Sequence, residues 1–520
     1  MPKSYPQMTI LIGAVAITRW IFRSHFLYDL DSVNFALAMD RFDPRVHQPH
    51  PPGYFLYIVL GRLLNTVFHD ASLALVVLSI LASCGAVIVI YQMAKLWFGP
   101  TAALFAASLF LFSPLAWFHG TVALTYIVEG FFSGVSGYLC WRIYSGSQGF
   151  ILPAAVVLGI SAGMRPSSLL FLSPLFLFSL LKAPLKARWV GLAVLILTIA
   201  VWFVPMIAAS GGFSAYFGAL LSLWHMVPSK GTIFNSSPAN SIARAFTILF
   251  IYLLCFGPAS VSPLGALGRK TPADPRKKTF TLFWIVPALC FFTFGYLKFV
   301  NSGYLLVLSV PACLWLGLWS AEWYEFSGCR RPWKIAVIAA CAGTNVLIFL
   351  VSPFYCSYRE IRRFEAQLES ITTALPRIAS ARDTLILSFD SHFDGFRHAG
   401  YYLPDYLTVE YPEVNLKEGT RIFSMHDRNT QFLTELPGAP YTRFVVFPLP
   451  QGDSYQQYFQ TVKDRLSGHS LQTLSVGGHE FITGPLSDLP LLFPNAPPAS
   501  LSGVYVPLHS GMPHVNSRSH

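Results

Sequence analysis

The sequence predicts an α-helical, polytopic membrane protein with about eleven spans and a small soluble α/β domain near the C-terminus. Of the 520 residues, 53% are hydrophobic and only 12% are charged, whereas soluble proteins usually carry about a quarter charged residues. Long apolar runs recur along residues 1–353. After residue 354 the composition changes to short β-like runs that are separated by clusters of Asp, Gly and Pro.

A membrane span needs roughly 20 apolar residues to cross about 30 Å of hydrocarbon. Segments that fit this rule lie near 8–27, 73–96, 101–118, 122–143, 150–164, 166–181, 189–209, 242–263, 280–297, 302–320 and 333–353. The two segments on either side of Arg165 are short and would also fit a re-entrant pair. We expect 8–27 to be an uncleaved first span, because its basic start is weak and no small-residue cleavage pattern follows it.

The basic residues of the connecting loops predict the topology. They gather on one side of the scheme: Lys182, Lys186 and Arg188; Arg269, Lys270, Arg276, Lys277 and Lys278; and Arg330, Arg331 and Lys334. That side is expected to be cytoplasmic. The loops 28–72, 210–241 and 298–301, and everything after 353, then lie outside. The formal net charge of +11 is thus explained by topology, and we expect no nucleic-acid partner.

Three regions are expected: a membrane domain at 1–353, an outer α/β domain at 354–484 and a flexible tail at 485–520. The segment 358–375 has apolar residues at helical spacing and predicts an amphipathic helix. Strands are predicted at 384–389, 421–425, 443–447 and 471–483. The tail is rich in Pro, Ser and His, a composition typical of loose segments.

Several chemistries lack a motif in this chain. The eight cysteines form no CxxC pair, so neither a disulfide framework nor a cysteine metal site is predicted. There is no Walker loop, no GxGxxG before a helix and no GxSxG, so nucleotide binding and serine hydrolysis are not supported.

The run 28–57, YDLDSVNFALAMDRFDPRVHQPHPPGYFLY, is the most varied polar stretch of the membrane region. Residues 32–42 predict a short helix that lies in the membrane interface. Asp31 precedes this helix and is expected either to cap it or to act as a catalytic base, two roles that are compatible. Asp29 is the rival carboxylate, and Asp40 and Asp43 are interpreted as solvated charges.

His47 and His50 form an H-x-x-H pair. Such a pair is a metal-site pattern on a helix, but the prolines at 49, 51 and 52 exclude a regular helix. We therefore expect hydrogen bonds from these histidines, and no cofactor, with a divalent metal as the open alternative. The Pro-Pro-Gly run at 51–53 predicts a rigid elbow before a second interfacial helix.

Charged residues near the outer ends of spans are further candidates. Glu129 lies within a predicted span, where a carboxylate is costly unless it is paired or faces water. It is expected either to pair with an Arg or a Tyr hydroxyl or, with Tyr126, to bind substrate. Arg165, Lys298, Arg19 and Arg23 are expected either to reach lipid phosphates or to bind the phosphate of a donor.

The first loop resembles that of a known superfamily. Asp31-Ser32 followed by His50-Pro51-Pro52-Gly53-Tyr54 is similar to the first loop of GT-C membrane glycosyltransferases, in the protein O-mannosyltransferase and aminoarabinose-transferase-like branch. That branch has Gly-Glu where this chain has Val33-Asn34, so the resemblance leaves the sub-branch and the acceptor open.

The resemblance implies a sugar transfer from a polyprenyl-phosphate donor to a hydroxyl of a protein, a lipid or a glycan on the outer face. Asp31 would be the general base. Asp29, His50, Tyr54, Tyr126 and Glu129 would contact the sugar or the acceptor, and the four basic residues named above would bind the donor phosphate. A multi-pass location in a cell membrane, such as the bacterial inner membrane, is expected.

Two other functions fit a protein of this class. A transporter or flippase of lipid-linked saccharide would need charged residues deep in several spans, whereas these charges are predicted near the outer ends. A membrane scaffold with an outer binding domain would not need a first loop so rich in polar groups.

Overall fold

The computed structural model describes residues 5–226, 238–262, 274–297, 299–326, 328–353, 356–389, 395–411, 414–416, 419–433, 435–448 and 460–493. The chain divides into two compact units, Met1–Gln367 and Leu368–His520. The division falls inside one helix, α17 (Tyr358–Ile378). Each unit is described by itself below.

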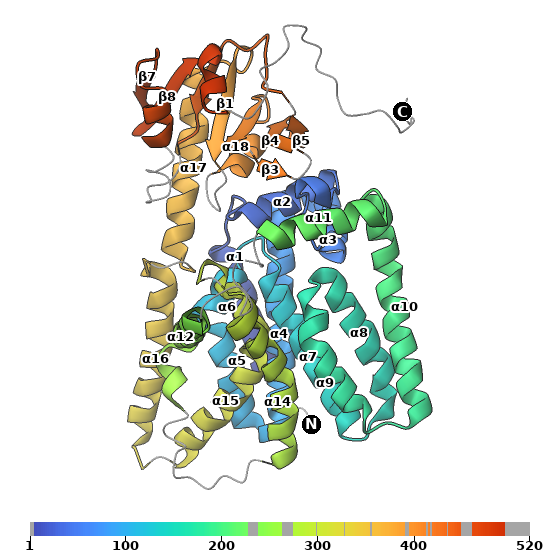
Figure 1. The fold of residues 1–520 in the computed structure, drawn as a ribbon. Helices are drawn as coiled ribbons and strands as arrows, with labels where there is room; N and C mark the ends of the chain where they lie inside the picture. Colours follow the sequence, from blue (N-terminus) through green and yellow to red (C-terminus); the bar gives the residue numbers. More distant parts are fainter. Residues whose placement is uncertain are drawn as a thin grey trace. The chain divides into compact units, whose positions relative to one another are not determined.

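Unit 1 is helical (Figure 1). Its α-helices are α1 (Tyr5–Ile21), α2 (Leu30–Asp40), α3 (Phe55–Phe68), α4 (Ala71–Phe98), α5 (Pro100–Leu111), α6 (Pro114–His119), α7 (Tyr126–Tyr144), α8 (Ile151–Met164), α9 (Ser167–Leu180), α10 (Leu185–Ala209), α11 (Phe213–Met226), α12 (Pro238–Phe256), α14 (Pro275–Cys290), α15 (Ser309–Phe326) and α16 (Arg331–Val351). Short helical turns are η1 (Pro44–Val46), η2 (Gln148–Phe150), η3 (Gly257–Val261), η4 (Phe291–Gly295) and η5 (Phe299–Leu308).

Each of the eleven predicted apolar segments contains helix. Among the described residues, 6 helices are long and apolar enough to cross a membrane, and shorter apolar helices occur at 6–21, 55–68, 100–111, 148–164, 167–180 and 213–223. The exact number of spans therefore stays a prediction. The break at Arg165 separates α8 from α9 as two distinct helices.

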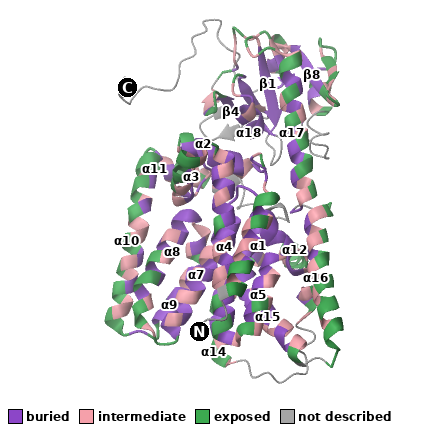
Figure 2. Ribbon diagram, turned by 180° about the vertical axis from the view of Figure 1, so that it is seen from behind, coloured by how far each residue is buried: buried purple, intermediate pink, exposed green. Residues whose placement is uncertain are grey.

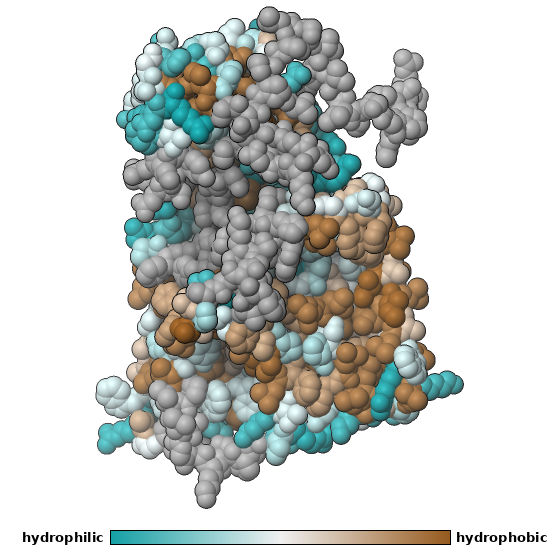
Figure 3. Space-filling model, in the orientation of Figure 1, coloured by the Kyte–Doolittle hydropathy of each residue, from teal (hydrophilic) through white to brown (hydrophobic). Residues whose placement is uncertain are grey.

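The surface of unit 1 is that of a membrane protein. Figure 3 shows a broad hydrophobic face above a hydrophilic lower edge. Exposed apolar side chains follow the length of α10, among them Leu185, Trp189, Ile196, Val201 and Val204. The α9–α10 turn and the start of α16 lie at the same lower end of unit 1 (Figure 1). Two of the three basic clusters thus share one end, whereas the side of the membrane on which it lies stays a prediction.

The helix α2 differs from the expected interfacial helix. It begins at Leu30 rather than Ser32, and every residue from Ser32 to Met39 is buried. Ser32 donates a hydrogen bond to the Ala123 carbonyl oxygen at 2.9 Å. Arg62 of α3 donates to the carbonyl oxygens at the end of α2, which suits the negative end of a helix. The sequence pattern did not predict this burial, because polar residues such as Asn34 occur inside the helix.

Unit 2 contains a mixed sheet of eight strands in the order β3-β4-β2-β1-β6-β8-β7, with β5 paired to β4. The strands are β1 (Thr384–Phe389), β2 (Thr408–Tyr411), β3 (Val414–Leu416), β4 (Gly419–His426), β5 (Asn429–Leu433), β6 (Arg443–Val446), β7 (Gln472–Val476) and β8 (His479–Pro485). β1 pairs in parallel with β2 and β6, and the other pairs are antiparallel. A short helix, α18 (Phe396–Tyr402), follows β1 in the chain.

The four predicted strand regions are all extended, and 471–483 is a hairpin rather than one strand. Gly477 and Gly478 form its turn with positive φ values of 63° and 82°. β1 is buried along its whole length (Figure 2). The helix predicted at 358–375 is α17, in which Ile361, Leu368 and Ile371 are fully buried. Short strands such as β3 and β5 lacked a sequence signal.

The first residues of the predicted tail are structured. β8 ends at Pro485, and the turn η6 (Leu486–Leu491) follows. Leu489, Leu492 and Phe493 are buried in the hydrophobic core of unit 2. These apolar side chains explain why the segment packs. The rest of the predicted tail, 494–520, lies outside the described residues.

Candidate active site

The Asp31 carboxylate lies in the first turn of α2. Asp29, not Asp31, caps this helix, and its Oδ1 accepts a hydrogen bond from the Asp31 backbone N–H at 2.9 Å. The expectation that Asp31 caps the helix is therefore wrong by two positions, because the helix starts at Leu30, two residues earlier than expected. A carboxylate in the first turn is stabilised in its charged form by the helix dipole.

His50, which follows η1 in the same loop region, contacts the Asp31 side chain. Its Nδ1 lies 3.2 Å from Asp31 Oδ1, and its Nε2 lies 3.1 Å from the Tyr54 hydroxyl. The turn between these residues is tight, since Gly53 has a φ of 110° and Tyr54 a φ of 46°. This is the predicted elbow, and α3 begins directly after it. Asp31 stays 26% exposed at its side chain, so the carboxylate is fixed but accessible.

A buried ion pair joins two helices. Arg165 follows the last residue of α8, and its Nε lies 2.9 Å from Glu129 Oε2 in α7. The other Glu129 oxygen accepts hydrogen bonds from the hydroxyls of Ser167 at 2.7 Å and Ser168 at 3.2 Å. Both serines belong to the first turn of α9, whose dipole also favours an anion. A buried charge requires such pairing, and the expectation that Glu129 pairs with an arginine is confirmed.

Aromatic rings surround the Arg165 guanidinium. Its central carbon lies 4.3 Å from the ring centroid of Tyr126, 4.6 Å from that of Tyr304 and 5.7 Å from that of Tyr54. Rings at such distances attract a cation through their quadrupoles. Sequence reasoning missed Tyr304, whose only signal was its position just after Asn-Ser-Gly at 301–303.

The cluster extends from Arg165 to Asp31. Tyr54 links the two, since its hydroxyl lies 3.1 Å from the His50 Nε2 and its ring centroid lies 5.7 Å from the Arg165 guanidinium carbon. Residues from α2, α3, α7 and η5 therefore surround one polar region of unit 1. We refer below to Asp31, His50, Tyr54, Tyr126, Glu129, Arg165 and Tyr304 as the polar cluster.

The irregular loop 120–125 forms a wall of this region and is wholly buried. Its carbonyl groups accept hydrogen bonds from three directions: the Ser24 backbone N–H to Thr121, Ser79 to Val122 and Ser32 to Ala123. Thr125 accepts one from Arg165. Non-helical backbone within a membrane protein requires this kind of satisfaction.

The other predicted site residues lie elsewhere. Arg19 is fully buried, donates to the Leu111 carbonyl oxygen at 2.9 Å and lies 4.9 Å from the ring centroid of Trp117. Arg23 donates to the Trp20 carbonyl oxygen at 2.8 Å. Neither arginine has a hydrogen bond or ion pair with the polar cluster among the described residues. Lys298 lies outside the described residues, and its role stays a prediction.

Two acidic residues of the first loop have different surroundings. Asp40 is exposed, as expected, but Asp43 is buried. Asp43 accepts hydrogen bonds from Arg45 at 2.8 Å and from Arg41 at 3.2 Å, and it raises the pKa of Arg45 through this bond. The interpretation of Asp43 as a solvated charge is thus wrong. Asp43 also caps η1, because its Oδ1 accepts a hydrogen bond from the Arg45 backbone N–H at 3.1 Å, so its role is to hold the turn.

The described residues contain no group of three or more His, Cys, Asp or Glu side chains that is arranged to hold a metal ion. His47 ends η1 in a left-handed conformation, whereas His50 contacts Asp31.

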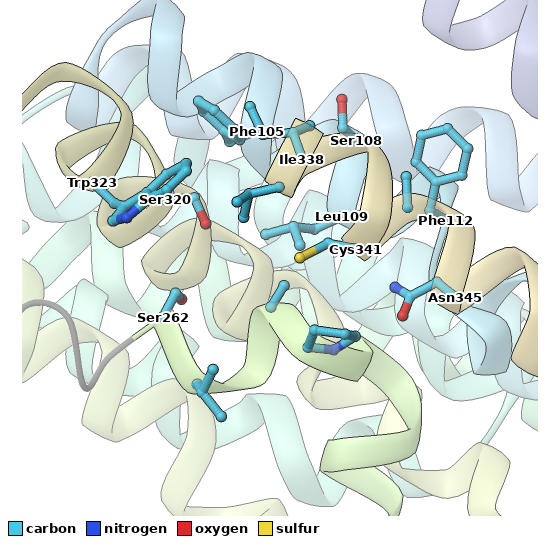
Figure 4. A pocket seen from close by; sticks show the side chains of 15 residues that line it. Phe105, Ser108, Leu109, Phe112, Ser262, Ser320, Trp323, Ile338, Cys341 and Asn345 are labelled. Carbon is cyan, nitrogen blue, oxygen red and sulfur yellow. The ribbon is translucent and has the colours of Figure 1, made fainter. Parts of the chain in front are cut away.

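Apolar cavities occur among the described residues of unit 1. One, of about 520 Å³, is lined by residues of α3, α8 and α10, including Leu56, Met164 and Trp202. Leu56 and Met164 are close in sequence to Tyr54 and Arg165 of the polar cluster. Another, of about 380 Å³, lies between α5, η3, α15 and α16 (Figure 4). Its lining among the described residues is mostly apolar and includes Cys341 and Asn345, but no Asp, Glu, His, Lys or Arg.

Comparison with solved structures defines the class by fold. The crystal structure of ArnT from Cupriavidus metallidurans bound to undecaprenyl phosphate matches with a TM-score of 0.59 and 11% identity, over 93% of this chain and 99% of that chain. The same protein in the apo state gives 0.54 and 12%, over 92% and 98%. The chain therefore has the fold of a GT-C-type membrane glycosyltransferase.

Further matches concern a sequence family and a more distant fold. Residues 44–188 match the model of the protein O-mannosyl-transferase TMEM260 N-terminal domain. The apo oligosaccharyltransferase of Archaeoglobus fulgidus aligns with a TM-score of 0.46 and 13% identity, over 78% of this chain and 64% of that chain. Comparison with curated proteins gave no match. The resemblance to the O-mannosyltransferase and ArnT-like branch is thus confirmed by a sequence model and a fold.

Proposed function

We propose that the protein is a membrane glycosyltransferase that moves one sugar from a polyprenyl-phosphate donor to a hydroxyl group on the outer face. The observation that carries this proposal is the Asp31 carboxylate. It is fixed by His50 at 3.2 Å, remains 26% exposed and belongs to a cluster that contains a buried arginine. A base and a cation on one polar region are the two groups that such a transfer requires.

In the proposed reaction, Asp31 accepts the proton of the acceptor hydroxyl. The acceptor oxygen attacks the anomeric carbon, and the bond from that carbon to the donor phosphate oxygen breaks, so the configuration inverts. The electron pair of the broken bond remains on the phosphate. His50 orients Asp31, and it is held in turn by the Tyr54 hydroxyl. A positioned base contributes roughly 10²–10⁴-fold to such a rate.

Arg165 is the proposed partner of the departing phosphate. Its charge is fixed by Glu129 at 2.9 Å and lies against the rings of Tyr126 and Tyr304. In this proposal Asp29 and Glu129 act mainly by holding Asp31 and Arg165. Lys298, Arg19 and Arg23 remain candidate donor contacts from the sequence alone.

The donor hydrocarbon fits the apolar cavity between α3, α8 and α10. Two of its lining residues are Leu56, two positions after Tyr54, and Met164, directly before Arg165. Exposed residues such as Leu197 and Val201 line its lipid side. This arrangement supports a donor whose chain occupies the cavity while its phosphate reaches the cluster. ArnT, which shares this fold, has been crystallised with undecaprenyl phosphate.

The proposed partners are a lipid-linked sugar and a protein, lipid or glycan acceptor, in a multi-pass location such as a bacterial inner membrane. The first loop and unit 2 are placed on the outer side. No divalent metal or other cofactor enters the proposed reaction.

The test uses purified full-length protein in lipid with a panel of polyprenyl-phosphate sugars, and it follows sugar release. Asp31→Asn is expected to lower the rate by about 10²–10⁴-fold without loss of folding. Asp40→Asn is the matched control, because Asp40 ends the same helix and is exposed. Unchanged sugar release by Asp31→Asn would refute the proposal and would favour a flippase or a scaffold.

A further inference from the structure

The segment 22–29 connects α1 to α2 and leads directly to Asp31. It contains no regular helix or strand, so its conformation depends on contacts with other elements. On one side, the Ser24 backbone N–H donates to the Thr121 carbonyl oxygen at 2.8 Å. On the other side it meets α17, and that contact contains a buried carboxylate.

Glu365 of α17 is 2% exposed. Its Oε1 accepts hydrogen bonds from the Ser24 hydroxyl at 2.9 Å and from the His25 backbone N–H at 2.6 Å. Its Oε2 faces Arg362 of the same helix and lies 3.9 Å from His25 Nδ1. Hydrogen bonds to an ionised acceptor are roughly twice as strong as neutral ones. Glu365 is therefore a charged anchor for two successive residues of the segment.

Aromatic packing continues this contact toward Asp29. Tyr28 lies between two rings, with centroids 5.1 Å from Phe364 of α17 and 5.3 Å from Phe118 of α6. Phe22 similarly meets Tyr358 at 4.9 Å. The chain then enters α2 at Asp29, which fixes the Asp31 backbone N–H. The hydrogen bonds of Ser24 and His25 and the ring packing of Tyr28 thus hold both ends of the 24–28 segment that leads from Glu365 to the start of α2.

We propose that Glu365 is a positioning residue for Asp31, and this inference rests on the proposed function. Glu365 holds the 24–28 segment, and through it the first turn of α2, at the place where the Asp31 carboxylate meets the acceptor. The residue does not touch substrate. Its loss shifts the base rather than removing it, so the chemical step slows while donor binding, which involves Arg165 and the apolar cavity, is preserved.

The test compares Glu365→Ala with Glu365→Gln in full-length protein in lipid. The alanine variant is expected to lower kcat by about ten- to a hundredfold, because displacement of a reacting group by about 1 Å costs that much, with KM for the donor changed less than about twofold. The glutamine variant keeps an oxygen acceptor for Ser24 and His25. It is expected to retain kcat within about threefold.

Glu369→Ala is the matched control, since Glu369 lies one turn further along α17 and is exposed. Hydrogen exchange provides a readout that is independent of catalysis: the amides of 24–31 are expected to exchange faster in Glu365→Ala only. Should that variant not fold, Ser24→Ala decides, with a smaller loss of kcat at constant KM as the expected result.

The outcomes separate the two proposals. A fully active Asp31→Asn variant overturns the proposed function. An Asp31→Asn variant without activity, together with unchanged kcat in Glu365→Ala or in the Ser24→Ala substitute, leaves the function standing and overturns the positioning role. A loss in Glu365→Ala that appears only as a raised KM also overturns it.

Discussion

The buried pair of Glu129 and Arg165 makes a sharp prediction about stability. Replacement of Glu129 by Gln leaves the Arg165 charge in a site where its side chain is 5% exposed and its partner 0%. The tyrosine rings around the guanidinium offset only part of this cost. The variant Glu129→Gln is therefore expected to be strongly destabilised, although the substituted side chain has nearly the same shape.

The magnitude follows from the contacts. Removal of one partner of a buried ion pair costs about 3–5 kcal/mol, whereas replacement of both partners by apolar residues is often nearly neutral. In the double variant Glu129→Leu/Arg165→Met, two serine hydroxyls lose their acceptor, at about 1 kcal/mol each. The free energy of unfolding of the double variant is thus expected to fall by about 2 kcal/mol. This loss is smaller than the loss expected for Glu129→Gln or for Arg165→Met alone.

Thermal unfolding of the full chain in detergent, followed by tryptophan fluorescence, measures this order. Glu325→Gln is the control, because Glu325 is an exposed residue at the end of α15. Sugar release is expected to be lost in the double variant despite its recovered stability. A Glu129→Gln midpoint equal to that of the unmodified chain would refute the expected cost of the unpaired Arg165 charge. A double variant with a midpoint below those of both Glu129→Gln and Arg165→Met would refute it as well.

Two further predictions concern other parts of the chain. In Gly303→Ala the new β-carbon would lie 2.5 Å from an atom of the Tyr126 ring and 2.6 Å from an atom of the His119 ring. The initial rate of sugar release should therefore fall by about tenfold or more. Gly343→Ala is the control and should keep its rate, because a β-carbon at Gly343 would have no atom within 4 Å. Burial lowers the pKa of His479 below its ordinary value. Position 479 of the unfolded chain then binds a proton more readily than that of the folded chain. The contribution of His479 to the free energy of unfolding is therefore complete above a pH of about 6.5 and declines as the pH falls toward the folded-state pKa. The unfolding midpoint should therefore drop on acidification, and an unchanged drop in His479→Gln would contradict this.

Apolar run length and amphipathic spacing predicted most of the fold. The membrane helices, α17 and β1 each carry a strong local pattern. By contrast, α11 was not predicted, because its residues fall inside the expected outer loop 210–241. Buried α2 was misplaced because its burial depends on distant partners such as Ala123, and a sequence pattern does not contain those.

The site residues that belong to one sequence motif could be predicted together. Contacts between residues far apart along the chain could not be predicted. Asp31, His50 and Tyr54 come from one loop, and the structure brings them together. Glu129 and Arg165 were chosen separately, as costly charges in apolar runs, and only the structure shows that they pair. Tyr304 enters the cluster from nearly 140 residues beyond Arg165, a relation that no local spacing contains.

The polar cluster draws on side chains from position 31 to position 304, and this span has a consequence for biosynthesis. During membrane insertion, the guanidinium of Arg165 leaves the translocation machinery long before Tyr304 is synthesised. Until then one aromatic face of the cation is uncovered. Competence for sugar transfer should consequently be acquired late in translation, and prematurely terminated chains would be inserted but inert.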